Sequence, residues 1–291
     1  MRTGRRKNER LPSSKPAQRK REGITMNVFR FELRRAWVGA AVWTLALIGL
    51  LSGLITAALP AFLESRTGVE NMLANFPPAF TAAFGMQMDN LFSFAGFYAF
   101  GFLYYSLFGA IMAASIGLDL FSREKRDKCM DFLLTKPRAR SRVFCEKLLA
   151  ALVLILASNA LFIAASLALY YAYAPAPLMP ERALLAASAL LLTELVFLAI
   201  GSFAAVFARK VRSVSGTATA IGFGGFILSA LHSILEEDKL RYITPNKYFD
   251  AAKAFFDGAF EPNYALTGAV LTLGLIVAAY VRYTRADIPA L

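Results

Sequence analysis

The segment SREKRDKCMDFLLTKPRARSRVFCEK, residues 122–147, decides the fold because it separates two long apolar runs, residues 94–121 and 148–174. Each run is long enough to cross a hydrocarbon core of about 30 Å, which takes roughly 20 helical residues. The segment is charged, but it also contains the apolar cluster Phe132, Leu133 and Leu134, followed by Pro137. An apolar cluster in a charged connection predicts a short helix that lies on the membrane or on a partner protein.

The rest of the chain repeats this pattern of apolar runs. Its 291 residues are 57% hydrophobic and only 18% charged, which is typical of an integral membrane protein. A run in lipid must satisfy its own backbone hydrogen bonds, so runs without β alternation are helices. We therefore predict an all-α membrane protein over residues 26–291, with six transmembrane helices near residues 37–63, 94–121, 148–174, 183–208, 214–231 and 265–281.

Positive charge sets the expected orientation. If the N-terminus is cytoplasmic, 26 of the 32 Lys and Arg residues lie on the cytoplasmic side, in agreement with the positive-inside rule. The sequence thus predicts a multi-pass protein of the plasma membrane with both termini in the cytoplasm. The net charge of +12 reflects this topology and contact with anionic lipids, and we expect no nucleic-acid partner.

The N-terminal region has two parts. Residues 1–25 are polar and basic, so we expect a disordered tail. The tail is either dispensable, or left out of the native protein by a start at Met26, or it is a polybasic lipid anchor. From Met26 the sequence MNVFRFELRRAW interleaves apolar and basic residues. This pattern predicts an amphipathic helix in the inner membrane interface before the first span.

Catalytic and metal-binding chemistry is not indicated. The two cysteines, Cys129 and Cys145, fall in the charged segment and should be reduced in the cytoplasm. Together with a single histidine they do not supply the four ligands of a zinc site, so we predict no metal. The chain has no G-x-x-x-x-G-K-[ST] sequence and hence no P-loop of its own.

One motif suggests an enzyme. Glu236, Glu237 and Arg241 form E-E-x-x-x-R, which resembles the first motif of the CAAX-type membrane proteases. Those enzymes also need two later histidine-bearing motifs, whereas the only histidine here, His232, comes before the pair. The protease is therefore a disfavoured alternative, and the charges more simply cap a helix end at the outer surface.

Polar and small residues mark the interior of the spans. Glu194 is the charged residue well inside a span, and Asn159 lies at a similar depth on the preceding span, counted from the turn near Pro177. We predict a hydrogen bond between Asn159 and a protonated Glu194, with either a structural or a transport role. Small-residue spacing predicts close helix packing at Gly49, Gly53, Gly216, Ala220 and Gly224.

The charged segment and its flanks resemble the first intracellular loop of the type-2 ABC exporter permeases. That family has a glutamate after the second span, a Gly-Thr, a Leu-Leu, a Pro-x-x-Arg and a downstream lysine. The matching residues here are Glu124, Leu133, Leu134, Pro137, Arg140 and Lys147, with Lys128-Cys129 in place of the Gly-Thr. The outer segments NMLANFPPAFTAAFGMQMDNLFSFAGF and LRYITPNKYFD and the closing RADI are also similar to the family.

The resemblance implies a mechanism and partners. The loop would form a coupling helix that seats in a groove of a separate ATP-binding subunit, which carries the ATP and Mg, and two permease copies or paralogues would share the pathway. The implied coupling residues are Glu124, Arg126, Asp127, Met130, Asp131, Phe132, Leu133, Leu134, Pro137 and Arg140. The alternatives are a loop that serves only as a positive anchor, a secondary transporter or channel subunit that uses Glu194, and a non-transporting sensor or immunity protein.

Overall fold

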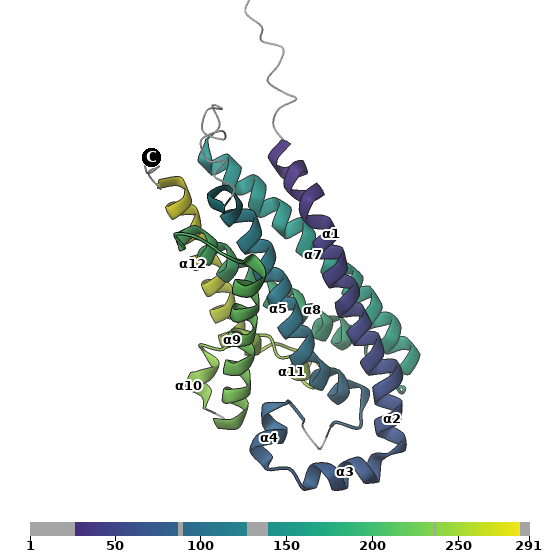
Figure 1. Ribbon diagram of the computed structural model, residues 1–291. Coiled ribbons are helices and arrows are strands. Elements are labelled where there is room, and N and C mark those ends of the chain that lie inside the picture. The colour runs from purple at the N-terminus through teal and green to yellow at the C-terminus, as the bar shows by residue number, and fades with distance from the viewer. Residues whose placement is uncertain (1–26, 87–89, 127–138, 236, 286–291) are drawn as a thin grey trace, which may run out of the picture.

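The computed structural model describes residues 27–86, 90–126, 139–235 and 237–285, and in these ranges the chain is a helical bundle without strands (Figure 1). The long helices are α1 (Asn27–Gly53), α5 (Phe94–Arg126), α7 (Arg140–Tyr173), α8 (Pro180–Phe207), α9 (Val214–Leu235) and α12 (Pro262–Arg285). The short elements are η1 (Leu54–Ala58), α2 (Leu59–Glu64), α3 (Arg66–Ala74), α4 (Pro78–Ala83), α10 (Asp238–Arg241), η2 (Pro245–Lys247) and α11 (Ala251–Phe256).

Six helical stretches of the described chain are long and apolar enough to cross a membrane, as predicted. The first combines α1, η1 and α2, and the other five are α5, α7, α8, α9 and α12. All six are longer than the apolar runs indicated; for example, α9 continues to Leu235, and α12 begins at Pro262 and ends at Arg285. Helices α8 and α12 begin at Pro180 and Pro262. Proline in the first turn of a helix costs no helical hydrogen bond, so both residues are suited to these starting positions.

The bundle has two chemically different ends (Figure 1). At one end, drawn at the top, α1 begins, α5 ends, α7 begins, α12 ends, and α8 connects to α9. We call it the basic end, because it carries the arginines and lysines near residues 30–35, 140–147, 209–212 and 282–285. The opposite end, which we call the loop end, carries the short helices α2, α3, α4 and α10.

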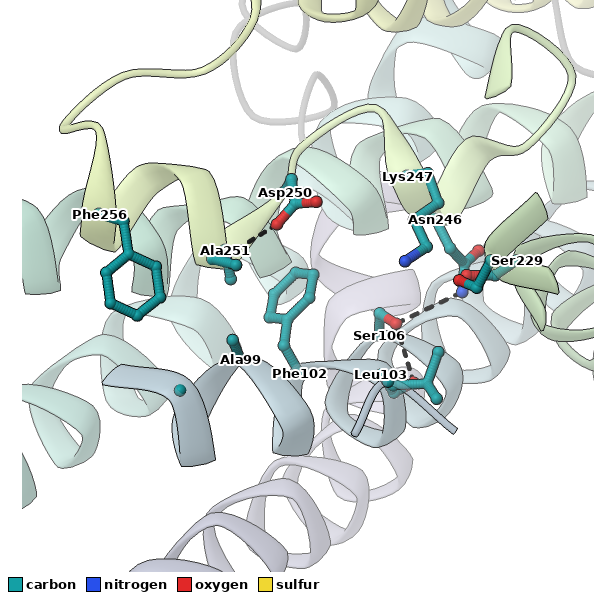
Figure 2. Close-up of a pocket in the computed structure, with 14 residues that line it drawn as sticks. Ala99, Phe102, Leu103, Ser106, Ser229, Asn246, Lys247, Asp250, Ala251 and Phe256 are labelled. Atoms are coloured by element: carbon teal, nitrogen blue, oxygen red, sulfur yellow. Dashed lines mark hydrogen bonds between the residues drawn. The ribbon is translucent and has the colours of Figure 1, made fainter. Parts of the chain in front are cut away.

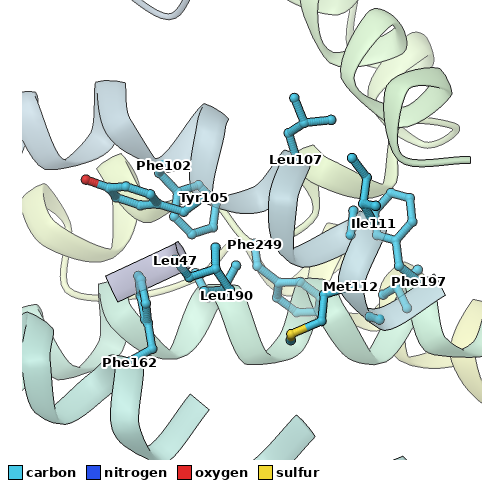
Figure 3. Close-up of a cluster of buried hydrophobic side chains, with 14 of the residues drawn as sticks. Leu47, Phe102, Tyr105, Leu107, Ile111, Met112, Phe162, Leu190, Phe197 and Phe249 are labelled. Carbon is cyan, nitrogen blue, oxygen red and sulfur yellow. The ribbon is translucent and has the colours of Figure 1, made fainter. Parts of the chain in front are cut away.

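The centre of the bundle is the pair α5 and α8, which have the most buried of the six spans. Their backbones approach closely at two glycines. A Cβ on Gly201 would lie 2.5 Å from the backbone oxygen of Ala114, and a Cβ on Gly117 would lie 2.8 Å from that of Leu198. Around this crossing, side chains such as Tyr105, Phe162 and Phe197 form the apolar core drawn in Figure 3. Helix α1 packs on α7, α9 on α5, and α12 on α8.

The predicted packing glycines are not the ones that make contact within the chain. A Cβ built on Gly49, Gly53 or Gly224 meets no atom within 4 Å, and one on Gly216 meets only the side chain of Ser213. Ala220 is exposed as well. The prediction of close packing at these positions is therefore wrong for contacts inside one chain, because the stripes on α1 and α9 face away from the neighbouring helices. The close contacts of α9 use Gly222, against Ile111, and Gly225, against Phe197 and Asn246.

The N-terminal helix that was expected at Met26 is present, and it is continuous with the first span. Helix α1 begins at Asn27 and runs without a break to Gly53. A π-helical turn, η1, then connects it to α2, which has Pro60 in its first turn. Proline cannot donate a backbone hydrogen bond, so a local change of helical pitch lets the span continue past it. Residues 1–25, the predicted tail, lie outside the described residues.

The segment between α9 and α12 is folded and contains the short elements α10, η2 and α11. Asp250 caps α11, because its carboxylate accepts hydrogen bonds from the backbone N–H groups of Ala252 and Lys253. Helix α11 packs on α8 and α5, where Phe255 meets the rings of Tyr98 and other aromatic residues. This segment therefore closes the bundle at the loop end.

Candidate functional site

Four charged side chains meet at the basic end, where α1, α5 and α7 come together. The Arg123 guanidinium of α5 forms ion pairs with Glu32 of α1 and with Asp119 one turn earlier on its own helix. The Lys147 ammonium of α7 lies 3.7 Å from the other carboxylate oxygen of Glu32 and donates a 2.6 Å hydrogen bond to the backbone oxygen of Leu120. We call Glu32, Asp119, Arg123 and Lys147 the charge cluster.

Three members of the charge cluster are buried, which makes their pairing necessary, and Asp119 is half-buried. Glu32, Arg123 and Lys147 expose only 4%, 6% and 1% of their surface. Taking a charge out of water costs several kcal/mol unless a partner and hydrogen bonds replace the solvent. Arg123 and Lys147 also bracket the charged segment that connects α5 to α7. Through Glu32, the cluster therefore connects both stems of that segment, the end of α5 and the start of α7, to α1.

Most of the predicted coupling residues lie outside the described residues. These are Asp127, Met130, Asp131, Phe132, Leu133, Leu134 and Pro137. Of the others, Glu124 and Arg126 belong to the last turn of α5, and Arg140 is the first residue of α7. The described chain thus fixes where the segment starts and ends, and its coupling helix remains a prediction.

The predicted contact between Asn159 and Glu194 is present in the middle of the bundle. The Asn159 amide of α7 donates a 2.6 Å hydrogen bond to Glu194 Oε2 of α8, and also a 3.0 Å bond to the backbone oxygen of Ile155. Both side chains are buried, and within the described chain Glu194 forms no ion pair. A bond of this kind between two antiparallel helices stabilises their register, and a transport role for the pair stays a prediction.

Glu194 also contacts a third helix, which the sequence did not indicate. A Cβ built on Gly109 of α5 would lie 2.7 Å from Glu194 Oε1, so the glycine makes room for the carboxyl group. The described residues offer that oxygen no hydrogen-bond donor. Two adjacent polar residues thus join α7 to different neighbours, since Ser158, next to Asn159, shares a 2.7 Å hydrogen bond with Thr44 of α1.

The E-E-x-x-x-R motif has a structural use. Arg241 forms an ion pair with Glu261, lies 3.8 Å over the ring centre of Tyr264 and donates a 3.1 Å hydrogen bond to the backbone oxygen of Lys247. These contacts join the α9–α12 segment to the start of α12. Glu237 is exposed, and Glu236 lies outside the described residues.

Glu32 and Asp119 are members of the site that the sequence does not mark as functional candidates. Lys147 is indicated only by the family resemblance. A signal was present: Glu32 is the single acidic residue in the basic stretch MNVFRFELRRAW, and Asp119 lies one helical turn before Arg123. A lone acid in a basic flank is a candidate for a buried ion pair, but its partner 91 residues away cannot be read from spacing.

Comparison with known proteins agrees with this architecture. A family model described as ABC-2 family transporter protein matches residues 26–288, which is nearly all of the chain after the basic tail. A search of curated proteins gives no match. The six apolar helices and the extent of the family match show that this chain belongs to the ABC-2 family of transporter proteins and is a membrane permease of an ABC transporter.

Proposed function

We propose that this permease is the transmembrane subunit of an ATP-driven exporter and that the loop of residues 123–136 docks on a separate ATP-binding subunit. The observation that carries the proposal is the charge cluster, because Arg123 and Lys147 connect both stems of the segment to Glu32. A segment that transmits force needs firm stems, and a buried ion network supplies them. A segment that serves only as a positive anchor has no need of one.

The proposal includes the orientation and the assembly. The basic end faces the cytoplasm, since it carries most of the positive charge, and the membrane is the plasma membrane. The partner subunit holds ATP and Mg and hydrolyses the ATP. A second copy of this chain or a paralogue completes the pathway, and the exposed glycine faces of α1 and α9 are open to such a copy. Export is the direction that the family resemblance implies.

The experiment that tests coupling removes the apolar side chains of the segment. Interface energy concentrates in a few buried residues, and truncating one can cost about 2 kcal/mol or more. We expect Phe132→Ala with Leu133→Ala to leave the permease in the membrane while the ATP-binding subunit no longer copurifies from the native host, as measured by mass spectrometry. Glu124→Arg should retain more of the association and uncouple ATP hydrolysis from transport.

A matched control removes apolar groups at the other end. Phe76 and Phe80 are half-exposed, stacked rings at the loop end, so Phe76→Ala with Phe80→Ala should not change copurification. Full copurification with the Phe132/Leu133 variant would remove this segment as the coupling element. Transport driven by an ion gradient without any ATP-binding partner would instead favour a secondary transporter.

A further inference from the structure

A small cavity lies at the loop end, between α5, α9 and the segment that leads into α11 (Figure 2). Its volume is about 70 Å³. Pockets for drug-sized ligands measure roughly 300–1,000 Å³, whereas a single water needs only about 10–15 Å³. The cavity therefore has room for a small polar group and not for a whole drug-sized molecule.

Two buried polar atoms at this cavity have no partner in the described chain. They are the Ser229 hydroxyl oxygen and Asn246 Oδ1, whose residues expose 1% and 4% of their surface. Leaving such a group unpaired costs about 1–3 kcal/mol, so each needs an explanation. Gly225 is part of the arrangement, because a Cβ there would lie 2.8 Å from Asn246 Oδ1. The glycine on α9 therefore allows the amide oxygen to sit at this place.

Two opposite charges line the same cavity. Lys247 and Asp250 both belong to its wall, and among the described residues they form no ion pair with each other. Burial lowers the pKa of the Lys247 ammonium, and the charge of Asp250 opposes that shift. The two groups thus line one cavity without pairing with each other. An anion beside Lys247 would restore the stability of the ammonium.

The polar groups of the cavity comprise two hydrogen-bond donors and two acceptors. Lys247 and the Ser229 hydroxyl can donate to an anionic group, while Asn246 Oδ1 and the Asp250 carboxylate can accept from a cationic one. Figure 2 shows Lys247, Asn246 and Ser229 together on one side of the cavity, with the ring of Phe256 on the other. Phe102 contributes a second apolar surface, suited to the carbon atoms that join the two charges.

We propose that this cavity binds a small zwitterionic group, in which an ammonium is joined to a phosphate or carboxylate by a short linker. The anion lies at Lys247 and Ser229, and the ammonium lies at Asp250 and Asn246. Two sources carry this chemistry: a zwitterionic lipid headgroup and a free compound such as phosphoethanolamine. The site lies at the end of the bundle opposite the charge cluster, so it does not depend on the ATPase-docking proposal.

The first test measures binding to the purified full-length permease by isothermal titration. The probes are phosphoethanolamine and β-alanine, compared with their one-charge relatives inorganic phosphate, acetate and ethanolamine. At least one zwitterion should bind tenfold or more tightly than its fragments. Nanodiscs of phosphatidylethanolamine or phosphatidylglycerol, followed by native mass spectrometry, test the lipid source, and selective retention of phosphatidylethanolamine would identify the membrane as the supplier.

Variants distinguish this site from a merely structural cluster. Lys247→Gln and Ser229→Ala should each weaken zwitterion binding by tenfold or more, while Lys239→Gln, an exposed lysine at the same end, should leave it unchanged. Asp250→Asn keeps a good helix cap, so the fold should survive. This change should weaken binding of the zwitterion and strengthen binding of inorganic phosphate, because the repulsion between carboxylate and phosphate is gone.

The outcomes decide the proposal. Equal affinity of the wild type for the zwitterions and their fragments, without retention of phosphatidylethanolamine, overturns it. Zwitterion binding that Lys247→Gln leaves intact, in a variant whose melting temperature matches the wild type, also overturns it. Binding of the free compounds only, or of the lipid only, supports the site and assigns its source.

Discussion

Neutralising Glu32 alone should destabilise the protein more than neutralising Glu32 together with Lys147. The four groups of the charge cluster carry two negative and two positive charges, so their sum is zero. Glu32→Gln leaves one buried positive charge in excess. Breaking a buried pair by removing one partner costs about 3–5 kcal/mol. Arg123 keeps Asp119 as a partner, so we expect the low end of this range, about 3 kcal/mol.

The double variant Glu32→Gln with Lys147→Met returns the sum of the cluster to zero. Its remaining charged pair, Arg123 and Asp119, is intact. Replacing both partners of a buried pair is often close to neutral, so the loss should fall to about 1 kcal/mol. The difference of about 2 kcal/mol is roughly a 30-fold change in the unfolding equilibrium constant. The second substitution, although it also removes a buried charge, would thus recover most of the free energy of unfolding that Glu32→Gln loses.

The free energy of unfolding can be followed by tryptophan fluorescence during denaturant titration in detergent micelles. Both tryptophans, Trp37 and Trp43, lie in α1, the helix that carries Glu32. Glu70→Gln is the control, because its ion pair with Arg66 is exposed, and surface pairs contribute only about 0–1 kcal/mol. A double variant that is no more stable than Glu32→Gln alone would refute the argument that the excess charge causes the loss.

Three further predictions concern the spans and the orientation. Glu194→Gln should keep the melting temperature and yield of the wild type. Glu194→Leu should lower the free energy of unfolding by about 1–3 kcal/mol, since Asn159 loses an acceptor in a medium without water. Equal melting temperatures of the two variants would contradict this. Gly201→Leu should abolish folding, visible as loss of the monodisperse peak in size exclusion, because its side chain meets the backbone of Ala114, while Gly49→Leu should fold normally. A membrane-impermeant maleimide should label exposed Cys145 in inverted vesicles and not in intact cells, and labelling from outside would reverse the proposed orientation.

The sequence predicts those parts of the fold that depend on local composition or on counting. Six apolar runs predict six spanning helices, and the short turn between α7 and α8 places Asn159 and Glu194 at one depth. Both predictions need only the rise per residue of a helix and the fact that the surrounding medium is a hydrocarbon layer of known thickness. They hold because the bilayer constrains length and depth along a single axis.

Contacts that depend on which faces of two helices meet could not be predicted in this way. The spacing of small residues is the same whether a helix faces a neighbour or lipid, so it predicts contacts at Gly49 and Gly53 and gives no sign of those at Gly117 and Gly201. The charge cluster joins residues on three helices, and no local pattern specifies their rotation. The polar cavity at the loop end combines residues of α5 with residues of α9 and the segment before α11, which follow them by more than a hundred positions.

The long sequence separation within the charge cluster has a consequence for biosynthesis. Arg123 follows Glu32 by 91 residues, and ribosomes add about 5–20 residues per second, so roughly 5–20 s pass between the two. During this interval the Glu32 carboxylate must be accommodated beside its neighbours Arg30 and Arg34, at the membrane surface. The first span therefore enters the bilayer before its ionic partner exists, and the contact closes only when the ribosome has delivered α5 and α7.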